Sequence, residues 1–232
     1  MQENNKLGVH LNIVKIAGFC YAMIIVLALV PNMMFSASAI TLADNPIAAM
    51  AKTQHLYSAG MGIEFTMYIM VMVLSWSLYV ILKPYHPQLA LFGFAFRFGE
   101  AILGCIAIIL YAMTLLLLSG SEFLNVFTSE QLGALGHFFL KVSGSTYDVL
   151  LTLMGNGAFA LIYLFLKAKL VPNWLSIWGL ITYFSMMCYG MINIFYPDAP
   201  AVLRFAMAPG ALFELTFGFW LFFKGINVAK FE

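Results

Sequence analysis

Charged residues are scarce in this chain: Asp, Glu, Lys and Arg make up 9% of its 232 residues. Soluble domains use roughly 25% charged residues, which help to cover their surface with polar groups. Here 63% of the residues are hydrophobic, so too few polar side chains remain to coat a soluble protein of this size. This balance excludes an ordinary soluble domain and predicts an integral membrane protein.

Several chemical signatures are also missing. Cys20, Cys105 and Cys188 lie far apart in apolar runs without a CxxC pair, a pattern that predicts buried free thiols rather than disulfides or a metal centre. The GxSxG, HExxH, P-loop and dinucleotide-binding patterns are absent, so the sequence predicts no cofactor. A net charge of +1 gives no electrostatic basis for a nucleic-acid partner.

Six apolar runs have the length and composition of membrane-spanning helices. The predicted spans cover residues 15–35, 57–82, 89–118, 146–166, 174–195 and 203–223. The first run is too long for a signal-peptide core, so we expect it to remain as the first helix. The sequence therefore predicts an all-α, polytopic membrane helix bundle that forms a single domain over residues 1–232.

Proline and a capping motif set several of the predicted helix ends. The second helix should stop before Pro84, because proline cannot continue a helix without losing a hydrogen bond. Thr128 and Gln131 have the spacing of a capping box, which predicts a helix start. From there the pattern stays helical for far longer than the ~30 Å hydrocarbon thickness requires. We therefore predict a break or strong tilt near Gly144 and Ser145.

The positive charges alternate between the two sides of a six-span arrangement. Seven cationic residues fall on one side and two on the other, and the positive-inside rule places the richer side in the cytoplasm. Both termini are then predicted to be cytoplasmic. The cytoplasmic set is Lys6, Lys15, Lys83, Lys167, Lys169, Lys224 and Lys230, and the outer set is Lys52 and Arg204.

Polar and small residues recur at steps of three and four along several helices, which places them on single helical faces. These faces consist of Gly93, Arg97, Glu100, Gly104, Ala107, Tyr111 and Thr114 on the third helix; Tyr57, Gly60, Glu64, Tyr68, Val71 and Ser75 on the second; Gly210, Glu214 and Gly218 on the last; and His137, Lys141, Asp148, Thr152 and Gly155 on the fourth and its outer extension.

Charged groups inside a bilayer cost roughly 2.5–3.5 kcal/mol each on insertion scales and usually face the bundle interior. Four acids and two cations lie in or near the predicted spans, mostly at the depth of the outer half and midplane. We therefore predict that at least one carboxylate is neutral or shares a proton or bound cation. The candidate ligand- or ion-binding residues are Arg97, Glu100, Glu64, Glu214, Asp148, Lys141 and Tyr111.

Three interpretations of this polar interior remain open at this stage. Arg97 and Glu100 are three residues apart and can form a purely structural ion pair. Alternatively, the interior binds a lipid headgroup, a small molecule, a proton or a cation. A third possibility is an intramembrane enzyme acting on a lipid, with Asp148 as general base. His55 and His137 are weak metal-ligand candidates for that enzyme, because two histidines and a carboxylate suit zinc, although their spacing matches no metal motif.

Four segments together resemble the domain-of-unknown-function 4386 family of bacterial integral membrane proteins. They are KIAGFCYAMIIV at 15–26, FRFGEAILG at 96–104, VPNWLSIWGLI at 171–181 and FELTFGFWLFFKG at 213–225. Lys15 departs from the arginine expected in the opening segment. The resemblance implies a six-helix bacterial membrane protein and implies no particular reaction. It also favours Arg97, Glu100 and Glu214 as functional residues, because they lie inside the matching segments.

The sequence thus favours a multi-pass membrane protein whose polar interior binds something small. The expected partners are the lipid bilayer and a lipid or small-molecule ligand. A non-catalytic accessory or assembly subunit is the further alternative.

Overall fold

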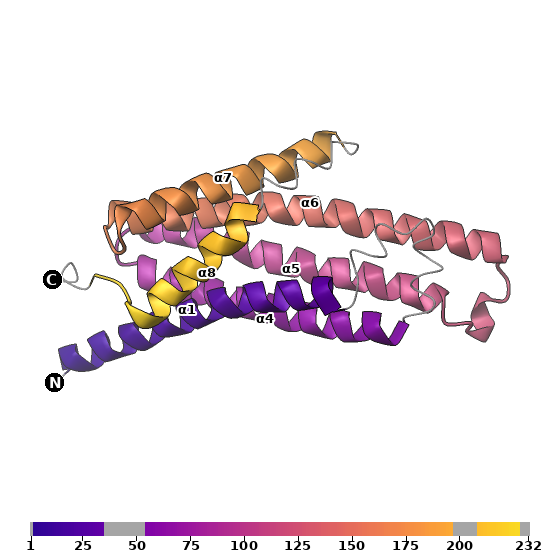
Figure 1. Ribbon diagram of the computed structural model, residues 1–232, viewed down its shortest axis with the longest axis horizontal. Coiled ribbons are helices and arrows are strands. Elements are labelled where there is room, and N and C mark those ends of the chain that lie inside the picture. The colour runs from indigo at the N-terminus through magenta and orange to yellow at the C-terminus, as the bar shows by residue number, and fades with distance from the viewer. Residues whose placement is uncertain (1, 35–53, 197–207, 228–232) are drawn as a thin grey trace.

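Every secondary-structure element in the described part of the chain is helical (Figure 1). A computed structural model describes residues 2–34, 54–196 and 208–227. The elements are α1 (Gln2–Met34), α4 (Gln54–Leu82), α5 (Pro87–Leu117), the short 3-10 helix η1 (Glu122–Leu124), α6 (Ser129–Lys167), α7 (Asn173–Phe195) and α8 (Ala208–Phe223).

Five of these helices contain an apolar stretch long enough to cross a membrane, and α8 is a shorter apolar helix. Lipid offers no hydrogen-bond partners, so a spanning segment must satisfy its backbone internally, as these helices do. The chain is therefore an all-α, multi-pass membrane helix bundle, as predicted. The orientation of its termini stays a prediction from the lysine pattern.

The predicted helix ends agree closely with the structure. Helix α4 ends at Leu82, two residues before Pro84. At the start of α6 the capping box is present: the Gln131 amide donates to the Thr128 hydroxyl at 3.3 Å, and the Thr128 amide donates to the Gln131 side chain at 2.9 Å. These bonds satisfy backbone donors that the first helical turn leaves unpaired.

Of the predicted break or strong tilt near Gly144, the break is wrong, because α6 runs without interruption from Ser129 to Lys167. Nothing lies within 4 Å of where a side chain on Gly144 would start, so no neighbour forces a bend. The Ser145 and Thr146 hydroxyls donate to backbone carbonyls one turn earlier, which keeps them inside the helix. A glycine in a helix costs only about 1 kcal/mol. Membrane thickness limits the apolar span, not the length of the helix that carries it.

Two predicted segments lie partly outside the described residues. Residues 35–53, which join the first two predicted spans, are outside the described residues, and the predicted last span begins at 203, whereas the described helix α8 begins at Ala208. Helix α1 starts at Gln2, well before the predicted span, because its polar N-terminal residues continue the helix beyond the apolar stretch Leu11–Leu29.

The six α-helices of the described residues form a closed ring. Going around it, α1 packs on α4, α4 on α5, α5 on α6, α6 on α7, α7 on α8, and α8 on α1. Figure 1 shows α8 lying across α1 at the end of the chain, where it closes the circle. Side chains that point away from lipid therefore meet inside this ring, whichever helix carries them.

The α1–α8 contact depends on two glycines. A Cβ atom on Gly18 would lie 2.5 Å from the backbone nitrogen of Phe222, and one on Gly218 would lie 2.9 Å from the carbonyl oxygen of Gly18. Both distances are shorter than real Cβ contacts, so only glycine allows the two backbones to approach this closely.

One end of the ring interior is packed with apolar side chains. This end is formed by the C-terminal parts of α4, α6 and α8 and the N-terminal parts of α1, α5 and α7. Its fully buried members are Val14, Ala17, Leu74, Leu78, Ile81, Leu82, Ala90, Leu161, Phe165, Leu175, Phe217 and Leu221. The lysine pattern predicts that this end faces the cytoplasm.

Candidate functional site

A buried ion pair lies inside the ring on α5. The guanidinium of Arg97 donates to the Glu100 carboxylate at 2.6 Å, and the two side chains are 1% and 4% exposed. The spacing of three residues places both on the inward face of the helix, which also carries Gly93 and Gly104. The structure therefore contains the pair that the sequence predicted.

A second buried acid, Glu214, comes from α8. Tyr183 on α7 donates its hydroxyl hydrogen to the Glu214 carboxylate at 2.7 Å, and the hydroxyl of Tyr21 on α1 lies 3.4 Å from that of Tyr183. Glu214 is 5% exposed, and both tyrosines are fully buried. The hydrogen bond that holds this carboxylate thus comes from a neutral phenol rather than from a cation.

The two groups belong to one cluster. Arg97 interacts electrostatically with Glu214, Tyr183 and Tyr21 as well as with Glu100, and the two carboxylates interact with each other. We call these five residues the inner cluster. It draws one residue from each of α1, α7 and α8 and two from α5, so it exists only when the ring is closed.

An aromatic layer lies directly beneath the inner cluster. The Tyr21 ring meets Phe217 edge to face with 5.3 Å between ring centroids, and the Tyr183 ring meets Phe213 in the same way at 5.7 Å. Phe165 packs on Phe217 at 5.2 Å. Phe165 and Phe217 also belong to the apolar end of the ring, so the inner cluster borders that end directly.

Towards the other end, the interior is lined by Glu64 and several tyrosines. Tyr68 is buried against the backbone of Gly104, where a side chain would collide with its ring. Tyr68 and Tyr147 both interact electrostatically with Glu64 and with Glu100, and Tyr147 also interacts with Glu214. Glu64 on α4 therefore shares the ring interior with the inner cluster.

Tyr147 is unusual because it faces inward and is still 44% exposed. It lies on the same face of α6 as the buried residues Ser143, Leu150 and Leu151, one turn before and after it. It lies in the electric field of three carboxylates inside the ring, Glu64 on α4, Glu100 on α5 and Glu214 on α8.

The remaining predicted site residues lie in three kinds of position. Tyr111 is half-buried and interacts with Glu64 and Ser143, so it belongs to the same interior. Asp148 is half-buried on α6. The other three candidates, Lys141, His137 and His55, are exposed on the outer surfaces of α6 and α4.

Within the described residues, no group of three or more His, Cys, Asp or Glu side chains is arranged to hold a metal ion. The three cysteines are free, as predicted; Cys20 is buried, and Cys105 and Cys188 are half-buried.

Tyr21, Tyr183 and Tyr147 are site residues that the sequence analysis missed. Tyr183 belongs to a face of α7 that repeats every three to four residues, and this face consists of Ser176, Gly179, Tyr183, Met186 and Gly190. This repeat of small and polar residues is the same kind of pattern that identified the polar faces of the other helices. Tyr147 carried no such signal. Because a break was predicted near Gly144, the helical repeat of the preceding residues could not be continued to Tyr147.

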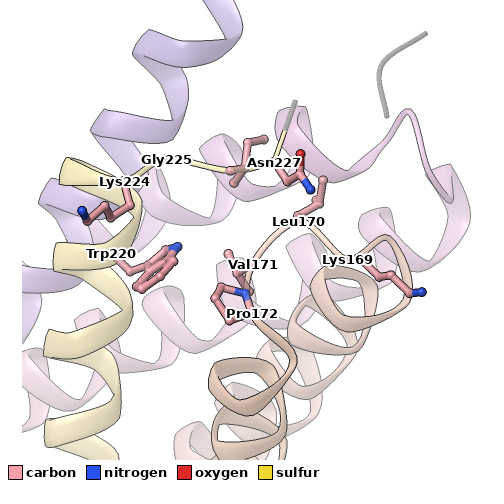
Figure 2. A pocket seen from close by; sticks show the side chains of 9 residues that line it. Lys169, Leu170, Val171, Pro172, Trp220, Lys224, Gly225 and Asn227 are labelled. Carbon is pink, nitrogen blue, oxygen red and sulfur yellow. The ribbon is translucent and has the colours of Figure 1, made fainter. Parts of the chain in front are cut away.

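A separate hollow of about 380 Å³ lies at the apolar end of the bundle, between the α6–α7 turn and the C-terminal end of α8 (Figure 2). Trp220, Val171 and Pro172 form much of its wall. Beside it, the backbone N–H of Asn227 donates to the backbone carbonyl of Leu170 at 2.8 Å. Figure 2 shows the Lys169 and Lys224 side chains directed to opposite sides, so their ammonium groups do not converge on one ligand.

Comparison with known proteins identifies the family. No curated protein and no solved structure matches the chain. The model of a family described as "Domain of unknown function (DUF4386)" matches residues 16–225, which include α8 and all the residues of the inner cluster. This chain, a multi-pass membrane helix bundle, therefore belongs to the DUF4386 family.

Proposed function

We propose that the interior of the helix ring binds a positive charge, namely a proton that can be exchanged for a cation. Glu214 and Glu100 are the binding groups, and Arg97 positions Glu100. Glu64 is the carboxylate through which the charge enters from the more polar end of the ring.

The observation that carries this proposal is the charge balance of the inner cluster. One guanidinium is shared by two buried carboxylates, and it forms its ion pair with Glu100. Glu214 is held by a tyrosine hydroxyl. Burying an uncompensated carboxylate costs several kcal/mol, so such a group takes up a proton or a cation.

The cluster also has an unused hydrogen-bond donor. Arg97 Nε is buried and has no hydrogen-bond partner among the described residues. An unmet donor of this kind costs about 1–3 kcal/mol, which a water or ligand oxygen would recover. The inner cluster therefore has the composition of a site that accommodates a further group, rather than of a fully satisfied structural pair.

Two of the other interpretations find less support. An anionic headgroup would compete with Glu100 for Arg97, which is already paired at 2.6 Å and 1% exposed. A lipid-modifying enzyme with a metal near His137 would need converging ligands, and the described residues offer no such group.

Residence in a bacterial cytoplasmic membrane, with both termini inside, is the setting that the family resemblance and the lysine distribution support.

The test is proton release from the purified protein in weakly buffered detergent solution. Sodium, potassium or tetramethylammonium chloride is added, and a pH indicator reports protons displaced from the protein. Infrared spectroscopy on the same samples follows the carbonyl band of protonated carboxyl groups. Glu214→Gln and Glu100→Gln are compared with Glu130→Gln, which changes an exposed acid at the start of α6.

We expect at least one of the added cations to release protons from the wild-type protein and from Glu130→Gln, with a matching loss of the protonated-carboxyl band. Glu214→Gln should release fewer protons while keeping the helical content of the wild type. The proposal fails if folded wild-type protein shows no protonated-carboxyl band and releases no protons with any of the three cations.

A further inference from the structure

The interface between α7 and α8 is the least extensive of the six helix contacts that close the ring in the described residues. Phe213 of α8 packs into this interface, with its ring centroid 5.6 Å from that of Trp178 and 5.7 Å from that of Tyr183 on α7. Glu214, the next residue along α8, accepts the Tyr183 hydrogen bond across the same interface. The α7–α8 interface therefore borders the inner cluster.

The hollow of about 380 Å³ lies at one end of this interface (Figure 2). Its wall includes Pro172, immediately before α7, and Trp220 on α8, whose ring meets that of Trp174 at 6.4 Å between centroids. Trp220 and Glu214 are six positions apart, which is about 9 Å along a helix. The interface thus leads from a hollow at the predicted cytoplasmic end to a buried carboxylate.

Apolar packing closes the interface between the hollow and Glu214. The Phe213 side chain is fully buried, and its ring occupies the place where a side chain on Gly179 of α7 would start. Water can therefore pass along the interface from the hollow to Glu214 only when the Phe213 ring is displaced.

Thr182 leaves a buried hydroxyl unsatisfied at the same interface. Its side chain is 3% exposed, and its Oγ1 atom has no hydrogen-bond partner in the described part of the chain. The side chain reaches α8, because its Cγ2 atom lies 3.4 Å from where a Cβ atom on Gly210 would start. Such an unmet group costs about 1–3 kcal/mol, as does Arg97 Nε in the inner cluster, and water that entered between α7 and α8 would recover that cost.

We infer that α7 and α8 separate, and that Glu214 exchanges its proton with the hollow through water that enters between them. The step is a proton transfer from the Glu214 carboxyl to that water, which leaves a carboxylate on Glu214 and a hydrated proton in the hollow. Helix α8 keeps its close contact with α1 at Gly18 and Gly218, and the Phe213 ring is displaced.

This inference rests on the proposed function, because it names a route by which the inner cluster gains and loses its proton. In the proposed function, charge enters past Glu64 from the opposite end of the ring. The α7–α8 interface adds a second route, which leads to the predicted cytoplasmic end.

The first experiment measures the opening without reference to proton binding. In a background without native cysteines, Thr182→Cys is labelled with methyl methanethiosulfonate in detergent and compared with Ser143→Cys. Ser143 is the matched control, because it is 1% exposed and lies in the extensive α5–α6 contact. Thr182→Cys should react at least 10-fold faster. Tyr183→Phe, which removes the hydrogen bond to Glu214, should accelerate it about 10-fold more, equivalent to ~1.4 kcal/mol.

The second experiment locks the interface. A disulfide needs Cβ atoms about 3.5–4.5 Å apart, and the contact between Thr182 and the Gly210 position brings Thr182→Cys/Gly210→Cys within reach of one. Gly93→Cys/Leu161→Cys links α5 to α6 as the control, because the Leu161 Cγ atom lies 2.5 Å from the Gly93 Cβ position. Cation-induced proton release is followed with each disulfide formed, and again after its reduction and removal of the reductant.

The disulfide between α7 and α8 should slow proton release at least 10-fold, and reduction should restore the rate. The disulfide between α5 and α6 should leave the rate unchanged. Circular dichroism checks that each variant keeps its helices. Thr182→Cys is a nearly isosteric change, so the labelling test decides the inference by itself where a paired variant does not fold.

Two results would overturn the inference and leave the proposed function in place. One is labelling of Thr182→Cys no faster than that of Ser143→Cys. The other is proton release that the disulfide between α7 and α8 leaves unchanged, since the proton then uses another route. Absence of both proton release and a protonated-carboxyl band from the wild type is the failure of the proposed function itself, and the inference fails with it.

Discussion

Replacing Arg97 with methionine should destabilise the protein strongly. Arg97 is 1% exposed and pairs with Glu100 at 2.6 Å, so its removal leaves a buried carboxylate without its cation. Breaking one partner of a buried ion pair costs about 3–5 kcal/mol. Glu214 loses its electrostatic interaction with the same guanidinium, which places the expected loss at the upper part of that range.

The double variant Arg97→Met/Glu100→Met separates charge from packing. If the cost of the single change comes from the unpaired carboxylate, removing Glu100 as well should restore most of the lost stability, because buried pairs replaced by apolar residues of similar volume are often neutral. Glu214 remains in both variants and is still held by Tyr183, so the comparison isolates the Arg97–Glu100 pair.

The measurement is unfolding by SDS in mixed micelles, followed by circular dichroism, with Lys141→Met as the control. Lys141 is exposed on α6, so its replacement should change the free energy of unfolding by no more than about 0.5 kcal/mol. If Arg97→Met is no less stable than Lys141→Met, the guanidinium does not compensate the buried acids, and the charge argument for the inner cluster is refuted.

Three further predictions concern the fold. Gly18→Ala should lower the free energy of unfolding by about 1–3 kcal/mol in the same SDS assay, because its Cβ would lie 2.5 Å from the Phe222 backbone nitrogen; equal stability would show that α1 and α8 are not in contact there. Gly144→Ala should instead raise the free energy of unfolding by up to about 1 kcal/mol, since α6 is continuous there and nothing lies within 4 Å of the new Cβ atom. A lower free energy of unfolding would mean that α6 is not continuous at Gly144. In a background without native cysteines, Lys83→Cys should be inaccessible and Glu122→Cys accessible to a membrane-impermeant thiol reagent added to intact cells; the reverse pattern would invert the proposed orientation.

Much of the inner cluster could be predicted from the sequence, because it follows from local periodicity. Arg97 and Glu100 share one face of α5 by their spacing alone, and the glycines flanking Glu214 marked the face of α8 that packs closely. Tyr183 was missed although its helix carries an equally regular face. The error on α6 had a different origin, since the thickness of the bilayer was taken as a limit on helix length.

The sequence by itself determined that this is a multi-pass helical membrane protein with charged groups inside its spans. A chain with 63% hydrophobic residues is suited to a lipid bilayer rather than to water. Inside lipid, each apolar run must form its backbone hydrogen bonds within its own helix. Hydrophobic runs, prolines and a capping box are local features, so the helices and most of their ends could be derived from them.

Only the tertiary structure decided which polar residues meet. Periodicity says which face of a helix points inward, but the ring order of the helices decides what that face encounters. Closure of the ring by α8 on α1 brings Glu214 to Tyr183 and Tyr21 and into the field of Arg97, residues far apart along the chain. The sequence already showed more acids than cations in the spans, but packing between helices decides that Glu100 and Glu214 are the two carboxylates that share one guanidinium.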